Sequence, residues 1–269
     1  VVWATTIGAV IGPNLIAPGD SLGMALGLPH LSGPFLITVF AQLAGATAFW
    51  IGLRPDPLLT ARSIDPSRSG ARPKGSIKSA IASLRGNKTA AFAVATIALS
   101  HMVMVAVMSM TPLHMHEMGY GLVVVGFTIS LHIAGMYAFS PIFGWLSDKL
   151  GKVKVVLLGQ VIYVVALGFA GFGQHDRTLV TIGLFLLGLG WSAATVAASA
   201  LLAQTLPVSE KTNVQGLSDR SMNLAGALGG AVSGSIVASI AFLGLNAAAF
   251  IPVALVVLFS AIAHIRRDR

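Results

Sequence analysis

Long apolar runs constrain this chain more than any other feature. A helix that crosses a membrane needs about 20 mostly apolar residues, and the sequence holds eight runs of roughly that kind, of which the first is short. We predict an all-α integral membrane protein with about eight spans, near residues 1–16, 31–53, 90–112, 121–146, 153–173, 178–205, 218–243 and 245–265. Because so little chain joins the last two runs, around Gly244, we expect them to form a tight antiparallel hairpin.

The composition agrees with a membrane protein. Of 269 residues, 55% are hydrophobic and 10% are charged, whereas a soluble domain carries about a quarter charged residues. The chain has no Cys, which excludes a disulfide framework, a thiolate nucleophile and Cys-ligated metals. No nucleophile and base combination occurs in a credible setting. We therefore expect neither an enzyme nor a protein with a cofactor or bound metal.

The positive charge is concentrated in one loop. The formal net charge is +8, but eight of the 17 basic residues lie between 54 and 88, and the rest of the chain has a surplus of only two. The charge therefore indicates no nucleic-acid partner. If the spans alternate, 16 basic residues fall on one side of the membrane and only Arg177 falls on the other. Because cytoplasmic loops retain Lys and Arg, we predict a plasma-membrane protein with a cytoplasmic C-terminus.

The same loop divides the chain. It is rich in Pro, Ser and Gly, as exposed linkers are, and it separates two spans in 1–53 from six spans in 89–269, with 54–88 as a cytoplasmic connection. Its end, residues 77–84, is mildly amphipathic, so it lies either in solvent or on the anionic inner leaflet. The chain begins at Val1 without Met, and its first run is short. We expect the sequence to begin partway into a longer protein.

The link between the fourth and fifth runs carries a specific motif. It reads Gly144-Trp-Leu146-Ser-Asp148-Lys149-Leu-Gly151-Lys152, which closely resembles the loop signature of the major facilitator superfamily. The resemblance implies a helical bundle of the major facilitator type, of which this chain holds helices five to twelve, and a gating role for the loop. A carboxylate among cations in a tight turn can pair with a neighbouring helix N-terminus and lock an inner gate.

A second motif lies in the first run. Gly8-Ala-Val-Ile-Gly12-Pro13 resembles the Gly-Pro signature of the proton-driven drug antiporters in that superfamily, although Ile16 stands where the pattern usually has another Gly. The resemblance implies a role in antiport. The alternative is structural, with Gly8 and Gly12 as a close-packing surface and Pro13 as a kink.

Polar residues at the centres of the spans are candidates for a substrate path, since transporter sites lie near the bilayer midplane. These residues are Gln42, His101, His132 and Trp191. The two histidines lie on adjacent antiparallel spans, where they could line one cavity and exchange protons, or hold helices together by hydrogen bonds. Gln42 and Trp191 could orient an amphipathic ligand, and packing against helices or lipid is the alternative for Trp191.

Methionines extend this path. Six of the nine Met lie between 102 and 118, and Met104 and Met108 share a helical face with His101,. Flexible Met side chains suit a surface that repacks around varied ligands. With His114, His116 and Glu117 they also allow an alternative interpretation as a copper site. Farther along, Gly226, Gly230 and Gly234 at four-residue spacing predict close helix packing.

These observations lead to one functional hypothesis and two alternatives. We expect a secondary transporter that exports small amphipathic or drug-like molecules in exchange for protons by alternating access. Its partners would be that small molecule, protons and the lipid bilayer, and the completed protein would act as a monomer. The first alternative is a transporter of a sugar, organic acid or siderophore. The second is a metal-binding membrane sensor or enzyme.

Overall fold

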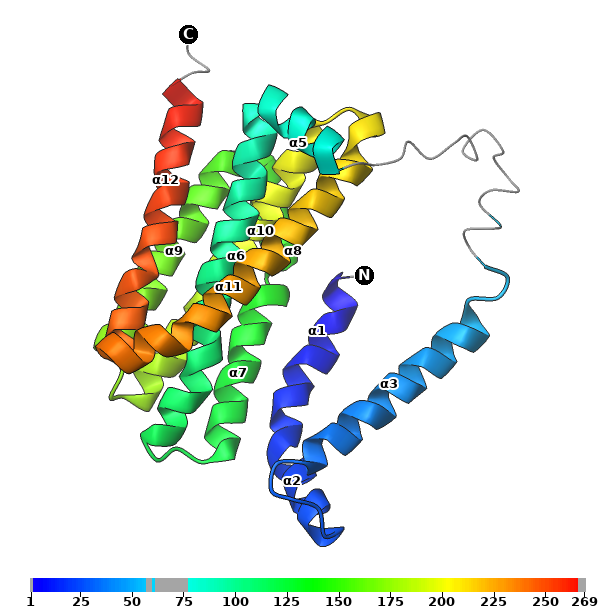
Figure 1. The fold of residues 1–269 in the computed structure, drawn as a ribbon, viewed down its shortest axis with the longest axis vertical. Coiled ribbons are helices and arrows are strands. Elements are labelled where there is room, and N and C mark those ends of the chain that lie inside the picture. Colours follow the sequence, from blue (N-terminus) through cyan, green and yellow to red (C-terminus); the bar gives the residue numbers. More distant parts are fainter. Residues whose placement is uncertain (1, 57–59, 61–76, 266–269) are drawn as a thin grey trace. The chain divides into compact units, whose positions relative to one another are not determined.

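The computed structural model describes residues 2–56, 60 and 77–265 (Figure 1). Most of the predicted basic loop and the basic residues of the tail lie outside these described residues. The chain divides into two compact units, Val1–Pro13 with Ile77–Arg269 and Asn14–Ser76, and each is considered by itself. The described helical elements are α1 (Val2–Ile11), η1 (Gly12–Leu15), α2 (Ile16–Ala25), α3 (Gly33–Gly52), α5 (Ile77–Gly86), α6 (Lys88–Glu117), α7 (Leu122–Tyr137), α8 (Ser140–Leu150), α9 (Lys152–Phe172), α10 (Arg177–Thr205), α11 (Val208–Ala248) and α12 (Phe250–Ile265).

The predicted all-helical membrane architecture is confirmed, with fewer separate spans than expected. Among the described residues, six helical stretches are long and apolar enough to cross a membrane. They are Gly33–Gly52, Lys88–Glu117, Leu122–Leu150, Lys152–Phe172, Arg177–Thr205 and Glu210–Ala261. The third combines α7 and α8, and the sixth contains both of the last two predicted spans. The first predicted run therefore needs correction, while the last two correspond to separate helices that meet at a kink.

The first run is not one helix ending at residue 16. It begins as α1, tightens into the 3-10 turn η1 at Gly12, and continues as α2 as far as Ala25. Pro13 explains the break, because proline has no N–H to donate to the carbonyl one α-helical turn earlier. Neither α1 nor α2 is long enough by itself to be a candidate span.

The last two predicted spans meet at a distorted turn. Within α11, Ile240 and Ala241 leave helical geometry, and Ala241 has φ of 60°. A methyl group on Gly244 would lie 2.4 Å from the Ile240 side chain, so the turn requires a residue without Cβ at that position. After the turn, α12 packs chiefly on α6 and α9. The chain therefore reverses tightly near Gly244, as predicted, but α12 then packs on α6 and α9 more than on α11 (Figure 1).

Helix α10 is at the centre of the first unit, against α6, α7, α8 and α9 (Figure 1). Small residues permit these contacts. A methyl on Gly159 of α9 would lie 2.8 Å from the backbone nitrogen of Ala194, and one on Gly188 would lie 2.2 Å from the carbonyl oxygen of His132. Tyr163 and Leu184 fill the adjacent core and are fully buried. The helix thus holds its neighbours at backbone contact distance.

Side-chain caps define both ends of this bundle. Asn87 accepts from the backbone N–H of Ala90 to begin α6, and its amide donates to the carbonyl of Thr205 at 2.8 Å, where α10 ends. At the opposite end, Asp176 accepts from two backbone N–H groups to begin α10. The start of α6, the α10–α11 connection and the end of α12 lie at one end (Figure 1), as alternating spans predict.

The second unit is a small helical pair. Helices α2 and α3 approach so closely that a methyl on Gly23 would lie 2.7 Å from the Cα of Gly33. In the turn between them, buried Asp20 accepts from the N–H of Leu31 and lies 2.8 Å from Nδ1 of His30. The turn is therefore fixed by one carboxylate.

Candidate functional site

Three aromatic side chains from three helices meet inside the first unit. Nε1 of Trp191 on α10 donates to Nδ1 of His101 on α6 at 3.1 Å. Tyr137, at the end of α7, meets the Trp191 ring edge to face with centroids 5.8 Å apart. We call His101, Tyr137 and Trp191 the aromatic cluster. The sequence predicted His101 and Trp191 from their depth in the spans, whereas Tyr137, which ends α7 within the candidate span Leu122–Leu150, was not among the predicted residues.

The hydrogen bond fixes the chemistry that His101 offers. Since Nδ1 accepts from Trp191, a neutral imidazole must carry its proton on Nε2. That edge of the ring faces α11, where a methyl on Gly226 would lie 3.0 Å from Nε2 and 2.7 Å from Cδ2. His101 is only half-buried. The ring is thus held in one orientation between Trp191 and the α11 backbone.

His132 lies in different surroundings. It is fully buried between α7 and α10, where Nδ1 donates to the carbonyl of Leu184 at 2.7 Å. Its Nε2 has no hydrogen-bond partner among the described residues. His132 has no exposed surface, and its hydrogen bond to Leu184 agrees with the alternative in which it holds helices together rather than lining a cavity in this conformation.

The remaining predicted path residues are dispersed. Met104 is buried in the core beside Tyr163 and Leu187, while Met108 one turn later is half-buried. Gln42 is exposed on α3 in the other compact unit. Of the six predicted residues, the structure therefore brings His101 and Trp191 together directly.

The predicted gating loop forms a tight turn between α8 and α9. Gly151 has φ of 95°, a backbone conformation that glycine adopts without strain. Asp148 is 75% exposed and lies 3.6 Å from Nζ of Lys152. Lys149 extends over the Trp145 ring at 4.4 Å. In this conformation Asp148 therefore pairs with a cation of its own loop rather than with a neighbouring helix N-terminus.

Two further motif residues anchor this loop. Leu146 packs on the buried core at this end of the bundle. Gly144 faces α10, where its ideal Cβ position lies 4.0 Å from Cγ1 of Val196. The motif thus combines an anchored apolar side with an exposed charged side.

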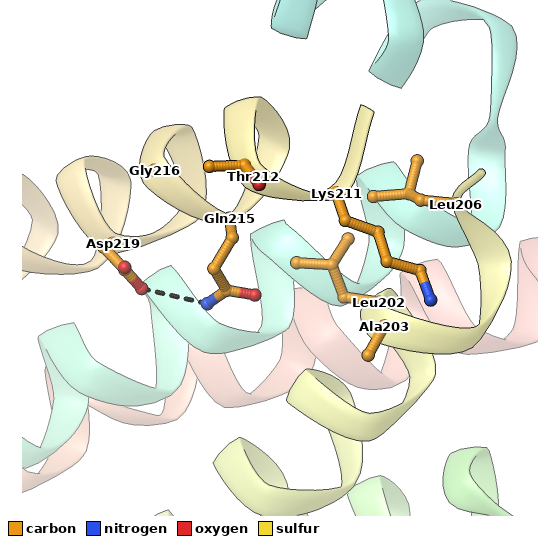
Figure 2. A pocket seen from close by; sticks show the side chains of 8 residues that line it. All are labelled: Leu202, Ala203, Leu206, Lys211, Thr212, Gln215, Gly216 and Asp219. Atoms are coloured by element: carbon orange, nitrogen blue, oxygen red, sulfur yellow. Dashed lines mark hydrogen bonds between the residues drawn. The ribbon is translucent and has the colours of Figure 1, made fainter. Parts of the chain in front are cut away.

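A groove lies where α10 ends and α11 begins (Figure 2). Its volume is about 460 Å³. Gln215 donates to Asp219 at 3.1 Å on one rim, so Asp219 is engaged within α11. The groove thus combines an apolar floor with a polar rim, and its lining comprises Leu202, Ala203, Leu206, Lys211, Thr212, Gln215, Gly216 and Asp219.

The glycine motifs differ in how closely they are packed. Gly226 and Gly229 touch α6, and a methyl on Gly229 would lie 2.7 Å from the carbonyl of Met102. Gly230 meets only the Val105 side chain at 3.4 Å, and Gly234 has no such neighbour within 4 Å. The close approach of α6 and α11 therefore follows Gly226 and Gly229 rather than the predicted four-residue spacing.

The Gly-Pro motif is differently placed. No described heavy atom of a neighbouring segment lies within 4 Å of the ideal Cβ position of Gly8 or of Gly12. Pro13 lies in the 3-10 turn. These two glycines therefore form no close helix contact within the described structure.

The histidines at the end of α6 belong to a helix contact. The His114 ring stacks on Phe242 with centroids 4.2 Å apart, and its Nε2 lies 2.8 Å from the carbonyl of Gln174. His116 and Glu117 are exposed. In the described part of the chain, no group of three or more His, Asp or Glu side chains is arranged to hold a metal ion. The copper interpretation therefore gains no support.

Comparison with known proteins identifies similar sequences. The sequence model of the Major Facilitator Superfamily matches residues 122–269. The chain is 36% identical over 244 residues to the uncharacterized MFS-type transporter YdeG of Bacillus subtilis (strain 168), covering 90% of this chain and 56% of YdeG. It is 35% identical over 239 residues to the uncharacterized MFS-type transporter YddS of the same organism, covering 87% and 54%.

A third relative is named with a cargo. The probable sulfoacetate transporter SauU of Cupriavidus necator is 31% identical over 117 residues, which cover 44% of this chain and 27% of SauU. The chain spans about half the length of YdeG and YddS.

Proposed function

Since the chain belongs to the Major Facilitator Superfamily, we propose that the protein of which it forms part is a secondary transporter that exports small amphipathic molecules in exchange for protons. The chain is an integral, multi-pass membrane protein. In the proposed cycle, two helical halves alternate around a site at the middle of the bilayer. The plasma membrane, with the C-terminus in the cytoplasm, is the proposed location.

The position of the aromatic cluster is the observation that carries this proposal. His101, Tyr137 and Trp191 each lie near the middle of a candidate span, in Lys88–Glu117, Leu122–Leu150 and Arg177–Thr205. Three spans thus bring polar aromatic groups together at the depth where transporters bind their cargo. Flat rings suit an amphipathic aromatic molecule, and half-buried His101 offers an imidazole that can carry a proton.

The α8–α9 turn supplies the proposed gate. Asp148 is 75% exposed although its partner Lys152 is largely buried, so a second cation can approach the Asp148 carboxylate from outside. In the proposed cycle, the loop binds the other half of the complete protein when the cytoplasmic side closes. Asp148→Asn should therefore lower the transport rate while leaving the folded yield unchanged, with Glu117→Gln at the exposed end of α6 as the matched control.

Transport by the complete protein in proteoliposomes tests the function. A fluorescent lipophilic cation is loaded, a pH gradient is imposed, and its release is followed with and without a protonophore. We expect proton-dependent release, and we expect its rate to fall at least about tenfold in His101→Asn, since loss of an essential proton-transfer group costs at least about 100-fold in catalysis. His175→Asn, in the exposed α9–α10 turn, should leave the release rate unchanged. Release that a protonophore does not affect would exclude proton coupling.

A second candidate is the transport of an organic acid. In the described stretch 88–265, Glu117, Asp148, Asp176 and Glu210 lie at or near helix ends, and Asp219 lies in the part of α11 before its middle, on the rim of the groove. This half therefore offers no carboxylate at the middle of the membrane to balance a cationic cargo. The name of SauU also favours an anionic cargo. Counterflow with a radiolabelled sulfonate in the same proteoliposomes distinguishes the two candidate functions, because only an anion transporter exchanges the sulfonate.

A further inference from the structure

Helix α5 lies at the basic end of the bundle, just before a span. It runs from Ile77 to Gly86, and a single residue, Asn87, separates it from α6 (Figure 1). It packs on α11 and α6, with Ala80 buried and Leu84 against the core. Since α6 is a candidate span, α5 must lie within a few ångströms of the membrane surface.

The apolar residues of α5 are more numerous than the bundle covers. At 3.6 residues per turn, successive side chains are about 100° apart around a helix. Ala80 and Leu84 therefore lie about 60° and about 20° to one side of Ile77, and Ile81 lies about 40° to the other side. The first two face the bundle, but Ile77 is 51% exposed and Ile81 is 39% exposed. An apolar edge is thus left outside the protein core.

Basic side chains border that exposed edge. Arg85 and Lys78 lie about 80° and about 100° from Ile77, directly beyond Ile81, and both are exposed. Helix α5 contains no acidic residue. Apolar side chains next to long cations form the arrangement by which a helix rests on a bilayer, with its apolar edge in the acyl boundary and its cations at the headgroups.

We propose that the Ile77–Ile81 edge of α5, with Lys78 and Arg85, binds the anionic lipid surface of the membrane that holds the protein. Charge complementarity selects lipid, because the neighbouring ends of α6, α9 and α11 add Lys88, Lys152, Lys154 and Lys211 to the same face of the membrane. An acidic headgroup layer gains contact with the exposed cations among these, Lys88 and Lys154, in addition to those of α5. The binding anchors the start of α6 and is independent of any cargo.

Lipid binding by the full chain tests this proposal without a transport assay. Native mass spectrometry of the purified chain measures the affinity for phosphatidylglycerol and, separately, for phosphatidylcholine. We expect a preference for phosphatidylglycerol that falls about fivefold in Arg85→Gln, because a basic residue at an anionic surface contributes about that factor. Lys78→Gln should have a similar effect. Arg177→Gln, an exposed arginine at the opposite end of the bundle, is the matched control.

Hydrogen exchange in nanodiscs locates the contact. We expect amides 77–86 to be more protected in discs with phosphatidylglycerol than in discs of phosphatidylcholine alone, and the difference to disappear in Arg85→Gln. Ile81→Ser should reduce the protection in both lipids. Equal affinity for the two lipids would overturn the proposal, as would an equal loss of the phosphatidylglycerol preference in Arg85→Gln and Arg177→Gln. Protection that is the same in both lipids would assign the edge to a protein contact instead.

Discussion

His101 and His132 occupy similar depths in neighbouring spans, yet they have opposite environments. His101 is half-buried, accepts a hydrogen bond from Trp191 and faces the backbone of α11 at Gly226. His132 is fully buried and donates to the carbonyl of Leu184 within the contact of α7 and α10. One ring is partly exposed between α10 and α11, and the other connects α7 and α10 with no exposed surface.

The difference teaches that depth in a span and direction around a helix are separate properties. Both residues satisfy the rule that an ionisable group inside a membrane faces protein rather than lipid. A buried imidazole with one satisfied nitrogen stabilises a helix pair, whereas a half-buried one beside Trp191 can meet a ligand. We therefore propose a structural role for His132 and a place in the substrate path for His101.

The largest expected effect is at Gly188, where α10 touches the backbone of His132. In Gly188→Ala the new methyl would lie 2.2 Å from the His132 carbonyl, so α7 and α10 must separate. We expect the free energy of unfolding in detergent to fall by about 3 kcal/mol, at the upper end of overpacking costs. Gly168→Ala, with open space around its Cβ position, should cost nothing. Similar losses at the two glycines would show that α7 and α10 are not in backbone contact.

Removal of the buried ring should be the next largest effect. His132→Ala leaves a cavity and an unpaired Leu184 carbonyl, so we expect a loss of about 2 kcal/mol in the free energy of unfolding. His101→Ala removes a half-buried ring and should cost less than half as much. Thermal unfolding of both variants in one detergent measures the difference. A larger loss for His101→Ala would reverse our assignment.

Trp191→Phe sharpens the functional side of the comparison. Phenylalanine keeps most of the ring but removes the N–H that donates to His101. A hydrogen bond of this kind contributes about 1 kcal/mol, so cargo transport by the complete protein should weaken about fivefold, with unchanged folded yield. Trp145→Phe, at the exposed gating loop, is the control. Transport at the original rate would mean that the orientation of His101 has no part in the cycle.

The smallest effect is expected at Gly226. The methyl of Gly226→Ala would press on the His101 ring at 2.7 Å, but a side chain moves more easily than a backbone. We expect the free energy of unfolding to change by no more than about 1 kcal/mol. We also expect a change in the fluorescence that Trp191 contributes, which is obtained by subtracting the spectrum of Trp191→Phe. An unchanged Trp191 contribution would contradict the contact between His101 and α11.

The sequence predicted features that depend on composition along the chain. Apolar runs gave the helical spans, and the motif Gly144–Lys152 was correctly placed at a helix junction, although most of it is the end of α8 and Gly151 alone separates α8 from α9. It could not predict the direction of His132 around α7, because every face of a buried membrane helix is apolar. The turn between the last two runs was predicted around Gly244 and lies at Ile240 and Ala241, but the sequence did not predict that α12 then packs chiefly on α6 and α9.

The role of glycine also depended on tertiary packing. Regular spacing predicted close packing at Gly226, Gly230 and Gly234 of α11. The tightest contact of α10 with α7, by contrast, is at Gly188, which belongs to no such repeat. Spacing identifies residues on one face of a helix, but only the neighbouring backbone decides which of them must lack a side chain.

Thiol labelling tests the central assignment most directly, since the chain has no cysteine of its own. His101→Cys and His132→Cys are each introduced singly, and their reaction with a small water-soluble maleimide is timed in membranes. We predict that the thiol at 101 reacts at least about ten times faster than the thiol at 132. A tenfold difference corresponds to only about 1.4 kcal/mol of added cost in exposing the buried site. We also predict that a bound cargo slows the reaction of the thiol at 101. Equal rates, or faster labelling at 132, would contradict the assignment of His101 to the substrate path.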